Sequence, residues 1–243
     1  PALSVDGVHL AYRSWANNDR RIMVFDLTSG QYTRLTNFAE DSRPDWSQDG
    51  VLVFDSARES DRGFRLYTIG YWVGATDRSL LDETGRSVSG SSPAWLGVNR
   101  IAYSSCTQGC GVYVVNADGS GASKVVDTLD RVSLDGSPDG SRIVYSARQD
   151  GRWDVFLIGT DGGGALRITD DEAVDWLPTW SPDGSHIAFV SNRDGNWAIW
   201  AATPDGKDLR KLFDTPGSPD GLVRDEPAWN SQGWIGERIS WAP

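Results

Sequence analysis

Histidine, methionine and long apolar runs are scarce in this sequence of 243 residues. It holds two His and one Met. Two histidines exclude a metal centre built on three or more imidazoles. No apolar stretch approaches the roughly 18 residues that a membrane-spanning helix needs. The sequence therefore predicts neither a histidine-rich metal site nor insertion into a membrane.

Basic residues are also fewer than acidic residues. Lys and Arg number 23 against 34 Asp and Glu, which gives a formal net charge of −11. A nucleic-acid-binding surface needs a stripe of basic side chains to neutralise phosphates, so we expect no nucleic-acid partner. The sequence also lacks a G-x-S-x-G elbow, an H-E-x-x-H pair and a phosphate-binding loop. It therefore predicts no enzyme and no cofactor from these motif classes.

Tryptophan, by contrast, is abundant. The 12 Trp outnumber the 7 Phe and the 7 Tyr, which suggests that Trp holds a repeated structural position. The chain begins at Pro1, and its one methionine is Met23. We therefore expect a processed mature chain or a segment of a longer one.

A short motif of the form Pro-x-Trp followed by a turn recurs along the chain. Its clearest copy is Pro178-Thr-Trp-Ser-Pro-Asp-Gly184. The residues aligned with the Trp of this copy are Leu3, Trp46, Trp95, Gly136, Trp180 and Trp229, spaced 43, 49, 41, 44 and 49 residues apart. A period of about 40–50 residues with Gly/Asp turns is typical of one four-stranded propeller blade per repeat.

The turn after each motif carries a residue suited to positive φ. Five of the six positions hold glycine (Gly7, Gly50, Gly140, Gly184 and Gly233), and the sixth holds Asn99. A tight hairpin needs positive φ at this position, and Asn tolerates it best after Gly. Each turn is followed by an aliphatic-small-aromatic strand such as Ile187-Ala-Phe189. Two further strands complete each repeat.

The repeat resembles the TolB-type β-propeller repeat, a relative of the WD repeat, most specifically where Ser137-Pro-Asp-Gly140 and Ser181-Pro-Asp-Gly184 occur in neighbouring repeats. We therefore predict an all-β fold, a six-bladed β-propeller of four-stranded antiparallel blades, as a single domain over residues 1–243. The predicted repeats are residues 1–41, 42–90, 91–130, 131–174, 175–223 and 224–243. The last blade would be incomplete, so we expect missing flanks of a longer chain to complete it.

Cys106 and Cys110 lie in the loop between the second and third strands of the third repeat. They can form a disulfide if the geometry allows it, remain free thiols, or contribute to a metal site with ligands from elsewhere. A disulfide would favour an exported protein.

The acidic segment Asp170-Asp-Glu-Ala-Val-Asp175 precedes the strand of Trp180. It allows two interpretations. One is a Ca²⁺ site, because hard cations bind several carboxylates. The other is a structural turn, because Asp175 precedes Trp180 by the same offset as Asp41 precedes Trp46. Ca²⁺ is the one bound ion that the sequence leaves open.

Hairpins between second and third strands should emerge on the same face as the connections between blades. Tryptophans on this face, next to polar groups, suit a protein contact or sugar stacking, but they could instead pack between blades. The candidate binding residues are Trp15, Asp150, Arg152, Trp153, Asp175, Trp176, Asp194 and Trp197.

These observations favour a non-catalytic scaffold that binds another protein through a propeller face or the central channel. The resemblance to TolB-type propellers implies an extracytoplasmic protein, periplasmic or secreted. One alternative is the gating propeller of a larger prolyl-oligopeptidase-like or tricorn-like peptidase. Another is a carbohydrate-binding propeller. Fold by itself does not choose among these functions.

Overall fold

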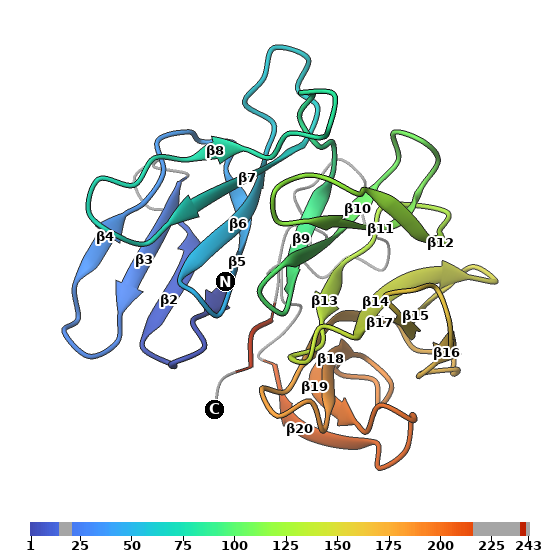
Figure 1. The fold of residues 1–243 in the computed structure, drawn as a ribbon. Helices are drawn as coiled ribbons and strands as arrows, with labels where there is room; N and C mark the ends of the chain where they lie inside the picture. The colour runs from blue at the N-terminus through green and yellow to red at the C-terminus, as the bar shows by residue number, and fades with distance from the viewer. Residues whose placement is uncertain (15–20, 216–238, 242–243) are drawn as a thin grey trace.

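The computed structural model describes residues 1–14, 21–215 and 239–241, which form an all-β propeller (Figure 1). Twenty strands are arranged in five sheets, the blades, and each blade has four strands paired in chain order. Every pair of neighbouring strands is antiparallel, as in β1–β2 and β2–β3. The predicted all-β propeller of four-stranded antiparallel blades is therefore confirmed, except for the number of blades.

The strands have the following bounds. Blade 1 contains β1 (Ala2–Leu3), β2 (His9–Arg13), β3 (Ile22–Asp26) and β4 (Tyr32–Arg34). Blade 2 contains β5 (Ser42–Trp46), β6 (Val51–Ser56), β7 (Arg65–Gly70) and β8 (Arg78–Ser79). Blade 3 contains β9 (Ser91–Leu96), β10 (Arg100–Ser105), β11 (Gly111–Asn116) and β12 (Ser123–Asp127). Blade 4 contains β13 (Leu134–Gly136), β14 (Arg142–Gln149), β15 (Arg152–Gly159) and β16 (Leu166–Arg167). Blade 5 contains β17 (Asp175–Trp180), β18 (Ile187–Ser191), β19 (Ala198–Ala202) and β20 (Arg210–Asp214).

The prediction of six blades is wrong, because the described residues form five. The sixth predicted repeat, residues 224–243, has only residues 239–241 within the described part of the chain, and these three form no strand. The physical reason is that the Pro-x-Trp motif marks one inner strand, whereas a blade needs three more strands beside it. Counting motifs therefore overestimated the number of blades.

The channel has two distinct ends. The first strands of the blades (β1, β5, β9, β13 and β17) are the inner strands, and those of blades 1 to 4 each contact the inner strand of the next blade. Because neighbouring strands are antiparallel, the turns after the first and third strands lie at one end, which we call the turn face. The hairpins between second and third strands lie at the other end with the connections between blades, and we call this end the connection face.

Three inner strands contain a β-bulge where the motif places its proline. The pairing register shifts at this point in β5, β9 and β17. The residue before each proline has positive φ: Arg43 (50°), Ser92 (51°) and Leu177 (52°). Proline has no N–H for a ladder bond, and a bulge leaves such a residue unpaired. In β13, where Leu134 takes the proline position, the pairing has no register shift.

The turns after the inner strands follow the glycine pattern with one exception. Gly7, Gly50, Gly140 and Gly184 have φ between 68° and 75°. In blade 3 the positive φ falls on Gly97 at 62° and not on Asn99. The prediction for Asn99 is wrong because β9 ends at Leu96 and β10 starts at Arg100, so this loop is shorter than the others. Gly233 lies outside the described residues.

Two of these turns are further fixed by an aspartate with an unusually low pKa. Ser137 and the Ser141 N–H donate to Asp139 at 2.6 and 3.0 Å. Ser181 and the Ser185 N–H donate to Asp183 at 2.6 and 3.0 Å. These bonds, led by the serine hydroxyl in each turn, stabilise the charged carboxylate and lower the pKa of both aspartates to about 2. The Ser-Pro-Asp-Gly motif thus forms a rigid rim on the turn face.

Gly136 stands where other repeats have Trp because its inner strand lies very close to the one before. A Cβ at Gly136 would lie 2.2 Å from the Trp95 carbonyl oxygen and 2.8 Å from Leu96 Cδ2. The Trp95 carbonyl belongs to the backbone and cannot move away alone. The departure from the motif at Gly136 is therefore a consequence of packing between blades 3 and 4.

The Gly136→Ala variant is expected to lower the free energy of unfolding by about 1–3 kcal/mol, because overpacking forces the backbone to shift. Urea unfolding of both proteins measures the difference. Gly63→Ala is the matched control, because the nearest atoms to its new Cβ belong to the flexible end of Arg65. A Gly136→Ala protein as stable as the wild type would contradict this explanation.

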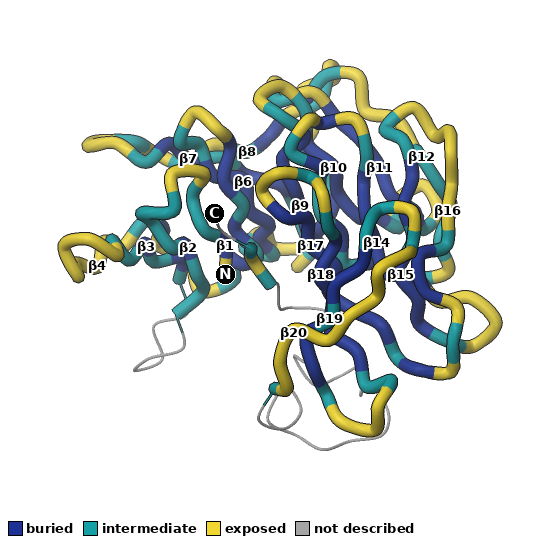
Figure 2. Tube along the Cα trace, turned by 90° about the horizontal axis from the view of Figure 1, so that it is seen from below, coloured by how far each residue is buried: buried dark blue, intermediate teal, exposed yellow. Residues whose placement is uncertain are grey.

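The core lies between the blades, and the outermost strands remain exposed (Figure 2). Strands β4 and β20 are exposed throughout, whereas every residue of β9 and β17 is buried. Aromatic pairs across the second and third strands of blades 2, 3 and 4 fill the space between sheets. Their ring centroids are 5.5–5.7 Å apart: Phe54–Tyr67, Tyr103–Tyr113 and Tyr145–Phe156.

Residues 239–241 lie between blade 5 and blade 1 (Figure 1). Ile239 and Trp241 pack against the apolar cluster of blade 5. Ser240 Oγ accepts a hydrogen bond from the Leu3 N–H of blade 1 at 3.0 Å. This short segment therefore joins the first and the last of the described blades.

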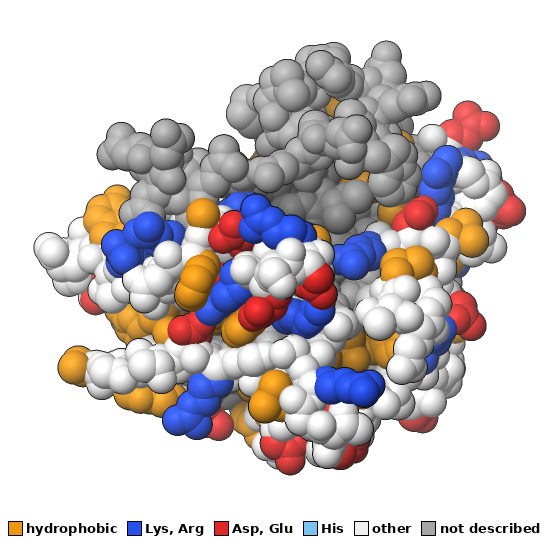
Figure 3. All heavy atoms as spheres, turned by 90° about the horizontal axis from the view of Figure 1, so that it is seen from above, with side chains coloured by type: hydrophobic (Ala, Val, Ile, Leu, Met, Phe, Trp, Pro, Cys, Tyr) orange, Lys and Arg blue, Asp and Glu red, His pale blue; other side chains and the backbone are white. Residues whose placement is uncertain are grey.

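Charged side chains of both signs mix on the face shown in Figure 3, where Lys and Arg are interspersed with Asp and Glu. The net charge of −11 therefore does not form a uniform acidic patch there. Within the described residues, no helix is long and apolar enough to cross a membrane.

Candidate functional site

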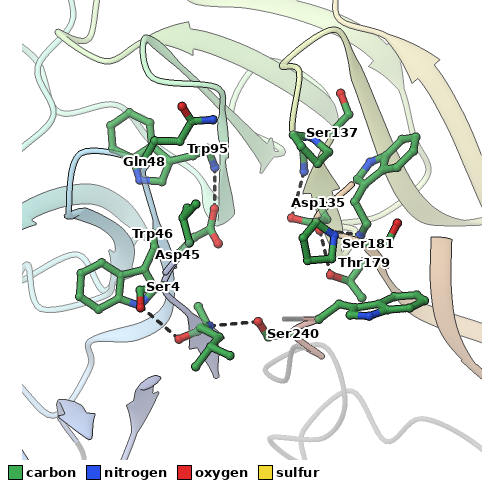
Figure 4. Close-up of a pocket in the computed structure, with 18 of the residues that line it drawn as sticks. Ser4, Asp45, Trp46, Gln48, Trp95, Asp135, Ser137, Thr179, Ser181 and Ser240 are labelled. Atoms are coloured by element: carbon green, nitrogen blue, oxygen red, sulfur yellow. Dashed lines mark hydrogen bonds between the residues drawn. The ribbon is translucent and has the colours of Figure 1, made fainter. Parts of the chain in front are cut away.

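A cavity of about 210 Å³ opens at the turn-face end of the channel (Figure 4). Its walls are the last residues of all five inner strands, the turns that follow them, and the segment Ile239–Trp241. Four tryptophans line it: Trp46, Trp95, Trp180 and Trp241. The repeated motif places three of these rings here, because each Trp stands at the end of its inner strand. A structural repeat has thereby created an aromatic cavity.

Two aspartates in the cavity tie neighbouring blades together. Asp45 Oδ2 accepts the Trp95 N–H at 2.7 Å, which links blade 2 to blade 3. Asp135 Oδ2 accepts the Trp180 N–H at 2.9 Å and the Thr179 hydroxyl at 2.9 Å, which links blade 4 to blade 5. Figure 4 shows the two carboxylates on opposite sides of the cavity.

These two aspartates were not among the residues predicted from the sequence, although a signal was present. Each stands immediately before the anchor position of its repeat, in Pro44-Asp-Trp46 and Leu134-Asp-Gly136. The other described repeats have Ala2, Ala94 and Thr179 at this position. Comparing the middle residue of the motif between repeats would have shown where acidic side chains enter the channel.

Two indole N–H groups of the cavity wall lack an acceptor within the described part of the chain. Trp95 and Trp180 are 8% and 4% exposed, and their Nε1 atoms are buried without a hydrogen bond. The Trp46 indole differs, because it donates to the Ala2 carbonyl at 3.2 Å. A buried donor without an acceptor costs about 1–3 kcal/mol. These two indoles therefore form part of the buried wall of the cavity and present no accessible donor to it.

Exposed apolar side chains surround this end of the channel. Val5 and Val98, in turns that follow inner strands, are 59% and 39% exposed. Trp72 and Val73, in the turn after the third strand of blade 2, are 62% and 104% exposed. The Trp72 ring lies on Gly70, where a Cβ would be 1.9 Å from it. Gly70 thus allows a large apolar group to sit at the surface of the turn face.

The predicted binding residues Trp153 and Trp176 meet between blades 4 and 5. Their ring centroids are 4.4 Å apart, and the side chains are 6% and 4% exposed. Trp197 is half-buried and packs against the same cluster. These three rings occupy the packing position between blades and do not form an exposed stacking surface.

The polar candidates are spread over the connection face and do not converge. Asp150 is exposed in a two-residue turn with Gly151, and Arg152 beside it is half-buried. Asp194 is exposed and pairs with Lys211. Trp15 lies outside the described residues. The described candidates do not line the turn-face cavity.

Asp175 belongs to a constellation that the structure contains twice. The buried Asp175 carboxylate pairs with Arg193 at 2.9 and 3.0 Å and also interacts with Thr169 and Ser191. Asp41 is likewise buried and has equivalent partners: Arg58 at 2.8 Å, Thr36 and Ser56. Burial is the main cause that raises the pKa of both aspartates, and the partners oppose it.

Two other carboxylates of the acidic segment, those of Asp170 and Asp171, are also paired with arginine. Asp170 contacts Arg167 at 2.8 Å, and Asp171 contacts Arg193 at 3.2 Å. In the described ranges, no group of three or more His, Cys, Asp and Glu could hold a metal ion. The contacts thus give Asp170, Asp171 and Asp175 structural partners, and Ca²⁺ binding stays a prediction.

The two cysteines form a disulfide in the structure, with Sγ atoms 2.05 Å apart. Of the three alternatives left open by the sequence, the first is therefore the one observed. The bond closes the hairpin between β10 and β11. A disulfide is consistent with an extracytoplasmic location.

The chain matches a protein-family model over more than half of its length. Residues 91–233 match the family model PD40, described as TolB beta propeller domain. The Tol-Pal system protein TolB of Anaeromyxobacter dehalogenans is 43% identical over 44 residues, which are 18% of this chain and 10% of that relative. The chain therefore matches only a small part of that protein's length.

Solved structures show the same fold at lower sequence identity. A TolB-type protein of Agrobacterium tumefaciens has a TM-score of 0.71 at 20% identity, over 88% of this chain and 79% of that one. TolB of Acinetobacter baumannii has a TM-score of 0.71 at 16% identity, over 87% of this chain and 54% of that one.

Proposed function

Because this chain belongs to the TolB beta-propeller domain family, we propose that it is a non-catalytic docking protein outside the cytoplasm. It would bind a protein partner at the turn face. The Tol-Pal system name of its relatives supports an assembly of proteins, and the Cys106–Cys110 disulfide supports an oxidising compartment.

The observation that carries this proposal is the combination found at the turn face. A cavity lined by Trp46, Trp95, Trp180 and Trp241 lies at the end of the channel. Exposed apolar side chains lie in turns at the same end. Trp72 and Val73 are the most exposed of them. Exposed apolar groups gathered around an aromatic, concave centre are typical of protein-docking surfaces. A partner segment would cover these apolar groups.

A paired-variant capture experiment tests the proposal. The protein is immobilised and exposed to the extracytoplasmic proteins of its source cell, and retained proteins are quantified. The double variant Trp72→Ser with Val73→Ser should lose the partner that the wild type retains. Leu129→Ser is the matched control, because Leu129 is 72% exposed in a connection between blades at the opposite face, and it should retain the partner.

Two results would overturn the proposal. One is retention that does not depend on Trp72 and Val73, because the partner would then bind elsewhere. The other is saturable binding of oligosaccharides on a glycan array without any retained protein, which would assign the face to carbohydrate.

A further inference from the structure

Two arginines from non-neighbouring blades meet at the connection-face end of the channel. Arg43 lies in β5 at the start of blade 2, and Arg131 lies in the connection that leads into β13 of blade 4. Both guanidinium groups lie over the ring of Phe64, at 4.9 and 5.2 Å from its centroid. Blade 3 stands between blades 2 and 4, so the two cations meet beside the channel. None of these residues lines the turn-face cavity.

A carboxylate bonded to Arg43, that of Asp55, is already engaged through both of its oxygens. Asp55 is completely buried, and its Oδ2 accepts Arg43 Nε at 2.6 Å and the Ser92 N–H at 2.7 Å. Its Oδ1 accepts the Ser42 hydroxyl at 2.6 Å. Asp55 therefore neutralises Arg43 and leaves the charge of Arg131 without a bonded counter-ion.

Arg131 has neither a hydrogen bond nor an ion pair with any described residue. Three other half-buried arginines are paired with carboxylates. Arg58 pairs with Asp41 and Asp77, Arg167 with Asp154 and Asp170, and Arg193 with Asp171 and Asp175. Burial, and then the nearby Arg43, lower the pKa of Arg131. Half-buried and next to a second cation, the Arg131 guanidinium is an electrostatically costly group that an added anion would stabilise.

We propose that Arg131, with Phe64 beneath it and Arg43 beside it, forms a binding site for the carboxylate group of a ligand. A guanidinium fork matches a carboxylate through two parallel N–H···O bonds. One unpaired positive charge matches a singly charged carboxylate better than a doubly charged phosphate. The overall charge of −11 also disfavours polyanions. The site lies at the opposite end of the channel from the turn-face cavity and does not depend on it.

The carboxylate could belong to a peptide or to an acidic sugar, and small probes distinguish these sources. The purified protein is titrated with acetate, with N-acetylglutamate amide, with N-acetylalanine and with glucuronate. Sodium chloride at equal ionic strength is the control. The Arg131 Nε–H signal in nuclear magnetic resonance should shift saturably with carboxylates and not with chloride. The strongest of the last three probes identifies the source as an acidic side chain, a chain terminus or a uronic acid.

Matched variants locate the binding. Arg131→Gln should weaken carboxylate binding at least about tenfold, which corresponds to 1.4 kcal/mol. Arg142→Gln is the control, because Arg142 is also half-buried over an aromatic ring, Trp180 at 4.8 Å. Arg142 lies at the start of β14, at the turn-face end of blade 4, and among the described residues no second guanidinium lies over that ring. This variant should bind carboxylates as the wild type does.

Three outcomes would overturn the proposal. They are the absence of saturable binding to every carboxylate probe, binding that Arg131→Gln leaves unchanged, and tighter binding of inorganic phosphate than of acetate. If Arg131→Gln fails to fold, the wild-type titrations with acetate, phosphate and chloride decide the question by themselves.

Discussion

Replacing Arg58 with alanine is expected to lower the free energy of unfolding by about 3–5 kcal/mol, the usual cost of leaving a buried charge without its partner. The Asp41 carboxylate is completely buried and accepts Arg58 Nη2 at 2.8 Å. Arg58 also pairs with Asp77. Its guanidinium lies 4.0 Å from the Tyr67 ring centroid and 4.1 Å from that of Phe38. Equilibrium unfolding in urea measures the loss.

Arg62→Ala is the matched control in the same loop. Arg62 pairs with Glu40 at 2.7 Å, but its side chain is 68% exposed, so this variant should lose no more than about 1 kcal/mol. Equal losses in the two variants would contradict the argument, because burial would then have no influence on the value of the ion pair.

The loss in free energy of unfolding caused by Arg58→Ala should depend on pH. Burial raises the pKa of Asp41 above its ordinary value, and Arg58 is among the groups that oppose this rise. Because the pKa is higher in the folded state, the contribution of Asp41 to stability is largest at low pH and is lost as the pH rises through the folded-state pKa. Removing Arg58 raises that pKa further. The difference in free energy of unfolding between the wild type and Arg58→Ala should therefore be smaller at about pH 4 than at about pH 7.

The Asp55→Ala substitution is expected to lower the free energy of unfolding by a similar amount, about 3–5 kcal/mol. Its carboxylate is completely buried and bonds Arg43, whose side chain is 10% exposed. It also accepts the Ser92 N–H of blade 3. The substitution leaves a largely buried cation and an unsatisfied buried N–H at the junction of blades 2 and 3. Urea unfolding of the variant and the wild type measures the difference.

The next junction provides the control for Asp55. Ser104 stands at the equivalent place in blade 3, and its hydroxyl accepts the Val132 N–H of the connection into blade 4 at 3.0 Å. Ser104→Ala removes a neutral acceptor and should cost about 1–3 kcal/mol. If Asp55→Ala cost no more than Ser104→Ala, the charge of Asp55 would contribute nothing beyond its hydrogen bonds.

The candidate site shows where sequence reasoning failed. For Trp153 and Trp176 the sequence left two roles open, exposed contact rings or packing between blades, and the structure shows the second, with ring centroids 4.4 Å apart. Alternation along a strand tells which residues share a side, but it does not tell whether a neighbouring blade covers that side. The cavity at the other end was missed because its walls, Trp46, Trp95 and Trp180, looked only like repeat anchors.

The sequence by itself determined the repeat, the antiparallel blade and its turns. These features depend on local chemistry: positive φ at Gly50, Gly140 and Gly184, the missing N–H of proline in the motif, and alternating apolar residues in the strands. Only the tertiary structure decided the number of described blades, the close approach that requires Gly136, and the meeting of Arg43 and Arg131 over Phe64. The reason is physical. The positions of whole blades relative to one another depend on contacts between residues that are tens of positions apart, and no local pattern encodes those distances.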